Sequence, residues 1–177
     1  EDGSFNLFGV VRASTWRSDG SDNQDPPELG MLHAFEVPSR GESTIIADMC
    51  NAYNTLDVDS QSQMAGLTGL DRHGAGPGGS MYENALDDDQ DEKTNDAVHP
   101  AVLVHPSMGR KMLYFNETHT RTFRELEHKD SVALLQKIIT HATRPENIYT
   151  HHWAIGDLLI WDQRSTIHRG AGDFPPE

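Results

Sequence analysis

The chain has 177 residues, of which 28 are acidic and 14 basic, so its formal net charge at pH 7 is -14. A surface with this charge repels phosphate backbones and anionic headgroups, which disfavours nucleic acid and membrane partners. The single cysteine, Cys50, cannot form an internal disulfide, and no apolar run approaches the roughly 20 residues that span a bilayer. We therefore expect a single domain over residues 1–177, cut at both ends, in a reducing cytoplasm.

The first half of the chain contains two predicted strands and a short predicted helix. Alternating side chains over residues 31–37 are typical of a strand, and β-branched residues predict a second strand over residues 44–47. Ser60, followed three residues later by Gln63, resembles a capping box and predicts a helix through residues 64–67.

The middle of the chain changes in composition. Residues 74–96 are rich in glycine and then acidic, without an apolar period, which predicts a long mobile surface loop of the kind that often acts as a lid. Strands are predicted again over residues 101–104 and 111–115, joined by a hairpin turn at residues 106–109.

The last third contains the clearest helix. Apolar residues recur at helical spacing behind the candidate caps Asp130 and Ser131, at Leu134, Leu135, Ile138, Ile139 and Ala142. Further strands are predicted over residues 148–153 and 158–161 and through Ile167. Many short strands with few helices predict a mainly β fold with flanking helices, either a sandwich or a jelly roll.

Two distant motifs form the strongest candidate site. In a strand, residues two apart project from the same face, so Arg17 and Asp19 can point to one place while His168 arrives from another strand. A facial triad of two histidines and one carboxylate uses this geometry and leaves three iron positions open. Position 17 is arginine, however, and an aspartate and a histidine so far apart in sequence are usually unrelated.

Four segments in a fixed order supply the context that these residues lack. They are Trp-Arg-Ser-Asp at residues 16–19, Gly-Glu-Ser-Thr at 41–44, His-Pro-Ser-Met-Gly-Arg-Lys at 105–111, and Gly-Asp-Leu-Leu-Ile-Trp-Asp-Gln-Arg at 156–164, followed by His168. Their order and approximate spacing resemble the taurine dioxygenase (TauD/TfdA) family, which also includes the phenoxyacetate herbicide dioxygenases. The resemblance runs from about residue 13 to the end of the chain.

The resemblance implies a double-stranded β-helix (jelly roll) of the clavaminate synthase-like kind, with Fe(II) as cofactor and 2-oxoglutarate as cosubstrate. It further implies that dioxygen is used to hydroxylate a small organic acid, such as a sulfonate or an aryloxy acid. Asp19 matches the metal carboxylate and His168 the distal metal histidine, so both would be catalytic. Thr44 matches the threonine that hydrogen-bonds 2-oxoglutarate, and Trp153 an aromatic residue near it. Oligomeric state stays open, with a homo-oligomer as one option.

Two departures from the family pattern imply weak or absent activity. Arg17 stands where the family has its first metal histidine, and a protonated guanidinium offers no lone pair to a metal. We expect Arg17 to pair with Asp19 instead, in competition with Fe(II). In addition, the family's arginine that clamps the distal carboxylate of 2-oxoglutarate would lie beyond Glu177.

Three alternatives remain. Arg17 favours a catalytically inactive jelly roll that serves as a binding or regulatory module, while the ten histidines leave room for a zinc hydrolase. His33 is the nearest conceivable replacement for the missing metal ligand, although a lone histidine on an apolar face is usually structural. The sequence does not distinguish a natural inactive paralogue from an altered residue at position 17.

Overall fold

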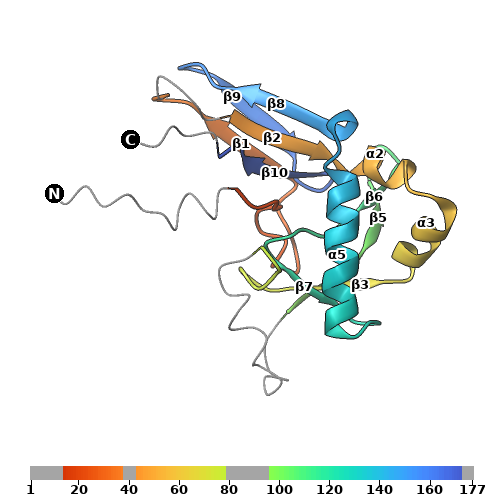
Figure 1. Ribbon diagram of the computed structural model, residues 1–177. Helices are drawn as coiled ribbons and strands as arrows, with labels where there is room; N and C mark the ends of the chain where they lie inside the picture. The colour runs from red at the N-terminus through yellow and green to blue at the C-terminus, as the bar shows by residue number, and fades with distance from the viewer. Residues whose placement is uncertain (1–13, 38–42, 79–95, 173–177) are drawn as a thin grey trace.

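The computed structural model describes residues 14–37, 43–78 and 96–172 (Figure 1). The strands of these parts are β1 (Leu29–His33), β2 (Ser43–Asp48), β3 (Thr68–Asp71), β4 (Ala97–Pro100), β5 (Val102–Val104), β6 (Lys111–Leu113), β7 (Thr120–Phe123), β8 (Ile148–His152), β9 (Leu158–Asp162) and β10 (Thr166–Gly170). The helices are α2 (Met49–Asn54), α3 (Val58–Ala65), α5 (His128–Ala142) and the 3-10 turn η1 (Pro145–Asn147).

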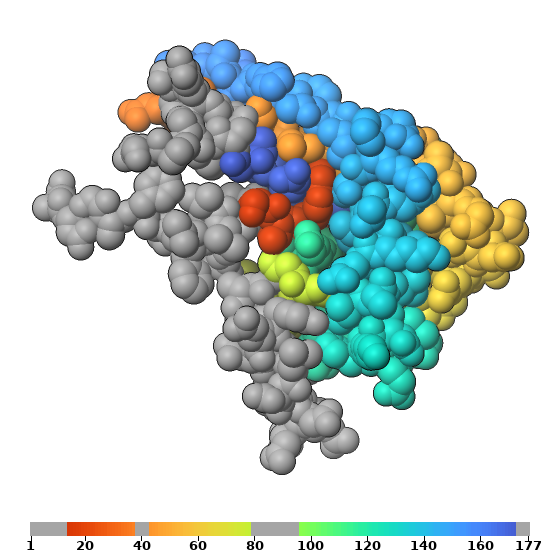
Figure 2. All heavy atoms as spheres, viewed as in Figure 1, coloured from red at the N-terminus to blue at the C-terminus, as the bar shows by residue number. Residues whose placement is uncertain are grey.

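The strands form small antiparallel sheets that lie in two groups. One group contains the three-stranded sheet β10-β2-β8 and the pair β1-β9, and the other contains the sheet β4-β3-β7 and the hairpin β5-β6. Figure 1 shows α5 extending from β8 to β7, with α2 and α3 to its right in this view. Figure 2 shows the same arrangement from the surface, with α5 forming much of the face toward the viewer. The predicted mainly β fold with flanking helices is confirmed.

The core packs around α5, α2 and β7 and extends onto one face of the sheet β10-β2-β8. The predicted apolar stripe of α5 is buried, and it joins Ala47 of β2 and Ile167 of β10 in one cluster. Burying each of these aliphatic side chains contributes about 1.5–3 kcal/mol relative to exposure. The core therefore occupies one face of the sheet and leaves the opposite face for other contacts.

The predicted caps of both helices were wrong. Asp57 caps α3, because its carboxylate accepts the Ser60 amide at 2.8 Å, so the helix begins three residues before the predicted capping box and ends at Ala65. Helix α5 begins earlier than predicted, with Glu127 at its cap and no side-chain hydrogen bond there. Ser131 does not cap α5 because its hydroxyl is buried and bonded to the backbone of Phe123 in β7.

The β5-β6 hairpin is confirmed, with Val104 opposite Lys111 and the His105 amide donating to the carbonyl of Arg110 at 2.8 Å. The predicted loop at residues 74–96 is described only in part. Its first residues are held in place, since Gly76 and Gly78 donate backbone hydrogen bonds to the carbonyls of Thr118 and Glu117. Residues 79–95 lie outside the described parts, so the mobility of the loop stays a prediction.

The strand expected over residues 31–37 is β1, which begins and ends earlier. It pairs with β9 from Leu29 opposite Asp162 to His33 opposite Leu158, and it stops where Ala34 meets the β8-β9 turn at Gly156 and Asp157. The ladder ends because its partner strand turns away.

Gly30 in β1 is required by its neighbour. A methyl group at this position would lie within 2.7 Å of three atoms of the Trp161 ring, which is closer than real side chains approach. We therefore expect Gly30→Ala to destabilise the fold by about 1–3 kcal/mol, through displacement of a buried ring. Thermal unfolding measures this loss. Gly66→Ala is the matched control, because the nearest atom to its added methyl is 3.6 Å away, and an equal loss in both variants would contradict the explanation.

Candidate functional site

The candidate site begins with a backbone bridge between two segments far apart in sequence. The Arg17 amide donates to the carbonyl of His168 at 3.0 Å, and the His168 amide donates to the carbonyl of Arg17 at 2.8 Å. This short antiparallel pairing fixes the turn that contains Asp19 against β10. His168 arrives from strand β10 as predicted, but the strand expected at residues 17–19 is a single bridge at Arg17 followed by a turn.

The Asp19 carboxylate lies between the side chains of Arg17 and His168. Its Oδ1 is 3.2 Å from Nε of Arg17, and its Oδ2 is 3.3 Å from Nε2 of His168. The imidazole of His168 is almost fully buried, whereas 57% of the Asp19 side chain is exposed. The convergence of Asp19 with His168 and the pairing of Arg17 with Asp19 were both expected, and both are confirmed as contacts.

These contacts hold Asp19 in its charged form. The hydrogen bond with His168 lowers the pKa of Asp19 most, against the opposing effect of partial burial, and the positive charge of Arg17 lowers the pKa further. An ionised carboxylate is the form that a metal or a guanidinium binds.

The residues here do not complete a facial triad. Asp19 and His168 have the chemistry of two ligands, but the third position holds the Arg17 cation. Nδ1 of His168 is buried and has no hydrogen-bond partner among the described residues. The unpaired Nδ1 is tolerable when the ring carries its proton on Nε2 and directs it at Asp19. A metal bound at Nε2 would replace that proton. Asp19, Arg17 and His168 together therefore favour an ion pair over a metal centre.

Thr44 and Trp153 lie together beside this pair. His168 is opposite Ile46 across the β10-β2 ladder, and Thr44, two residues before Ile46, is on the same face of the sheet. Nε1 of Trp153 donates to Oγ1 of Thr44 at 3.0 Å. An open hollow of about 160 Å³ borders Trp153, and its other walls are Leu32, His33, Ala34, Glu36 and Val37. Trp153 thus contacts Thr44 and also borders a space for a small molecule.

His33 does not supply the missing ligand. It is opposite Leu158 in the β1-β9 ladder, whereas Trp161, whose ring centroid is 5.0 Å from that of His168, lies on the other face of that sheet. The His33 ring packs against Phe35 instead. These contacts agree with a structural role for His33.

The segments at residues 105–111 and 161–164 contact each other through a network of charged groups. His105 Nε2 lies 2.7 Å from Asp162 Oδ2, and Arg164 contacts the same carboxylate and Glu28. Burial alone would raise the pKa of Asp162, but hydrogen bonds from Arg164 and His105 lower it to about 2. This network joins the β5-β6 turn to the end of β9.

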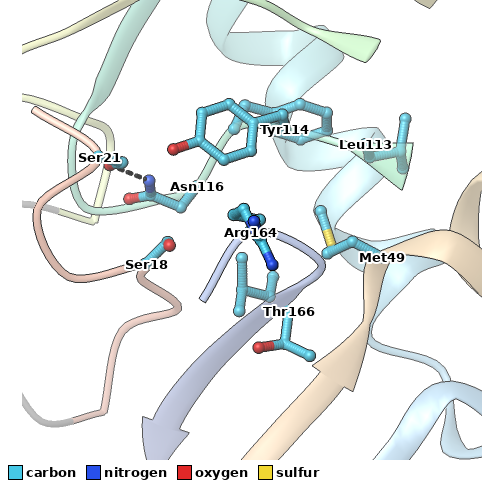
Figure 3. A pocket seen from close by; sticks show the side chains of 10 residues that line it. Ser18, Ser21, Met49, Leu113, Tyr114, Asn116, Arg164 and Thr166 are labelled. Atoms are coloured by element: carbon cyan, nitrogen blue, oxygen red, sulfur yellow. Dashed lines mark hydrogen bonds between the residues drawn. The ribbon is translucent and has the colours of Figure 1, made fainter. Parts of the chain in front are cut away.

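A second polar network holds the turn that carries Asp19. Ser18 points away from Asp19 and donates to the carbonyl of Gln163 at 2.8 Å, and the Asn116 amide donates to Ser21 at 2.8 Å. Figure 3 shows Ser18, Ser21 and Asn116 beside one small cavity, with Arg164 across from them. The backbone amide of Asn116 also donates to Oγ1 of Thr120. These buried hydrogen bonds fix the turn on both sides of Asp19.

A further cluster lies next to this turn and has no signature in the sequence. Asp22, His73 and His119 each offer a ligand atom, and these atoms lie within 4.8 Å of one another. The residues come from the turn after Asp19, the segment after β3 and the segment before β7. No fixed spacing links three such segments, so only the folded chain reveals the cluster.

Comparison with known proteins defines the class. A family model described as "Taurine catabolism dioxygenase TauD, TfdA family" matches residues 3–177. The crystal structure of AAD-2 in complex with Mn(II) and N-oxalylglycine matches with a TM-score of 0.80 and 29% identity, over 96% of this chain and 58% of that one. The chain belongs to the TauD/TfdA dioxygenase family, and the predicted jelly-roll class is confirmed.

Curated relatives agree with this assignment. The alpha-ketoglutarate-dependent 2,4-dichlorophenoxyacetate dioxygenase of Cupriavidus pinatubonensis is 35% identical over 93% of this chain and 56% of its own length. Pentalenolactone F synthase of Streptomyces arenae is 29% identical over 100% of this chain and 62% of its own length. The chain thus spans a little over half the length of the relatives that it matches. None of the described helices has the length and apolarity of a membrane span.

A buried carboxylate near the polar network gives a testable pH dependence. Burial raises the pKa of Asp71, at the end of β3, to about 7, and hydrogen bonds with Thr120 and Ser21 offset only part of this effect. The folded state therefore keeps a proton on Asp71 that the unfolded chain loses near pH 4. The contribution of Asp71 to the stability of the fold is therefore greatest at low pH and falls as the pH rises toward 7.

We expect Asp71→Asn to remove this dependence, because the amide is neutral at every pH. Relative to the variant, the unsubstituted chain should lose on the order of 2 kcal/mol of stability between pH 5 and pH 8. Urea unfolding at a series of pH values measures the difference, with Asp59→Asn on the exposed side of α3 as control. A difference that stays constant with pH would show that Asp71 does not titrate in this range.

Proposed function

We propose that this chain is part of an Fe(II)- and 2-oxoglutarate-dependent dioxygenase that hydroxylates a small organic acid of the aryloxy or sulfonate class. In this proposal Asp19 and His168 are the metal ligands and catalytic residues, while Thr44 and Trp153 bind 2-oxoglutarate. Arg17 compromises the activity. Dioxygen and the organic acid are the partners, the cytoplasm is the location, and assembly into a homo-oligomer stays open.

The observation that carries the proposal is the contact between Asp19 and His168 in a chain of this family. The Thr44-Trp153 hydrogen bond and the adjoining hollow support it, since they offer a polar group and a wall for a small acid near the same sheet face. The relatives named as alpha-ketoglutarate-dependent enzymes support the reaction class, and the name of the Cupriavidus protein supports an aryloxy acid.

The roles of this chain's own residues are limited by Arg17. Asp19 stays ionised, His168 directs Nε2 at the metal position, and Thr44 presents an oxygen beside Trp153. Without a third ligand these residues would hold a metal weakly.

Arg17 also favours a second candidate, a catalytically inactive jelly roll that binds a small acid or regulates a partner. The Arg17-Asp19 contact supports it, because the cation neutralises the carboxylate that a metal would use. A partly exposed pair of this kind contributes no more than about 1 kcal/mol. The missing third ligand therefore weakens metal binding more than the ion pair does. A substitution at position 17 can restore that ligand.

Replacing Arg17 with histidine tests the two candidates. Loss of a residue that only orients a metal ligand lowers metal affinity by about 10–100-fold. Arg17→His restores a direct ligand, so it should raise Fe(II) affinity by at least about 100-fold. Anaerobic titration of Fe(II) in the presence of 2-oxoglutarate, followed by the visible charge-transfer band, measures the change. Succinate formation by the full-length protein carrying Arg17→His, with aryloxy and sulfonate acids, then identifies the substrate class.

Arg17→Gln is the matched control, because it removes the charge without adding an imidazole. It should raise Fe(II) affinity less than about fivefold, the most that a pair worth about 1 kcal/mol permits. If Arg17→His binds Fe(II) no better than Arg17→Gln, the metal position is misplaced and the inactive module becomes the better account.

A further inference from the structure

Asp22, His73 and His119 lie outside the candidate site and have no role in the proposed reaction. Asp22 Oδ2 and His73 Nδ1 are 3.2 Å apart, and the rings of His73 and His119 are tilted toward each other with their centroids at 5.3 Å. His119 is buried at the base of the cluster, whereas 64% of the His73 side chain is exposed. The cluster thus has one rigid member and one that can adjust.

The donor set is one that first-row divalent metals prefer. Two imidazoles and a carboxylate suit Zn(II), Co(II) and Fe(II) and leave further positions for water. Two ligands about 2.0–2.1 Å from a tetrahedral metal are roughly 3.4 Å apart, which is close to the separation of the Asp22 and His73 atoms. All three ligand atoms lie within 4.8 Å of one another, and His73, the exposed member, has room to adjust on binding.

Metal binding would require His119 to give up a hydrogen bond that it already makes. The amide of Gly74 donates to Nδ1 of His119 at 3.1 Å, so a neutral ring has its lone pair at Nδ1 and its proton on Nε2. A metal at Nδ1 would replace this hydrogen bond, whose net contribution is about 1 kcal/mol. The cluster also lies beside acidic groups, and the net charge of -14 favours cations over the whole surface.

We propose that Asp22, His73 and His119 form a divalent transition-metal site that is separate from the Asp19-His168 pair. Zinc is its expected occupant, because histidine and carboxylate ligands with open positions suit it. The site does not depend on dioxygenase activity, since none of its residues contributes to the proposed triad. It lies on the turn that carries Asp19, so an occupied site would brace that turn against the segments after β3 and before β7.

Titration with Co(II), followed by visible absorption, tests the proposal on the chain as it exists. The unsubstituted chain should bind one Co(II) per cluster with the d-d bands of a site of low coordination number. His73→Asn should weaken this binding at least tenfold, and because His73 is exposed this variant should keep the fold, which circular dichroism checks. Competition with Zn(II) should displace the cobalt.

One control tests the specificity of the site. His33→Asn removes an exposed histidine elsewhere and should leave Co(II) affinity unchanged. Absence of Co(II) binding, equal binding by His73→Asn, or loss of binding in His33→Asn would each overturn the proposal. Failure of the dioxygenase proposal would leave these results as expected here.

Discussion

The paired backbone hydrogen bonds between Arg17 and His168 are the constraint on which the site depends. They bring a turn near the start of the chain against the last described strand, and they set the Asp19 carboxylate against the buried imidazole. The polar networks around Ser18, Asn116 and Asp162 hold the Asp19 turn and the end of β9 in place. We expect a chain without this bridge to retain the α5 core but to lose the constraint that holds Asp19 in contact with His168.

The same bridge makes the residue at position 17 decisive. The Arg17 side chain is directed at Asp19 and forms an ion pair with it. The ion pair itself is weak because it is partly exposed. We therefore expect any loss of metal affinity at this position to follow from a missing lone pair more than from a competing charge.

The sequence predicted those parts of the fold in which local pattern and final packing agree. The apolar stripe of α5 and the turn of the β5-β6 hairpin are examples, because each is specified within a short segment. Strands β3, β4 and β7 were missed, since β3 contains Gly69 and Asp71 and is a strand only because its neighbours pair with it. Cap positions failed for a related reason: the Ser131 hydroxyl bonds to Phe123, a contact that no local pattern reveals. The Asp19-His168 contact was predicted through family resemblance, whereas Asp22, His73 and His119 carried no such signal.

The most direct test of this account is a crystal structure of the unsubstituted chain grown without added metal. We expect Nε2 of His168 and the Arg17 guanidinium each to lie within about 4 Å of a different oxygen of the Asp19 carboxylate, the usual limit for an ion pair. An Asp19 side chain directed into solvent, or Arg17 and His168 on unpaired strands, would contradict it and remove the basis for the metal position.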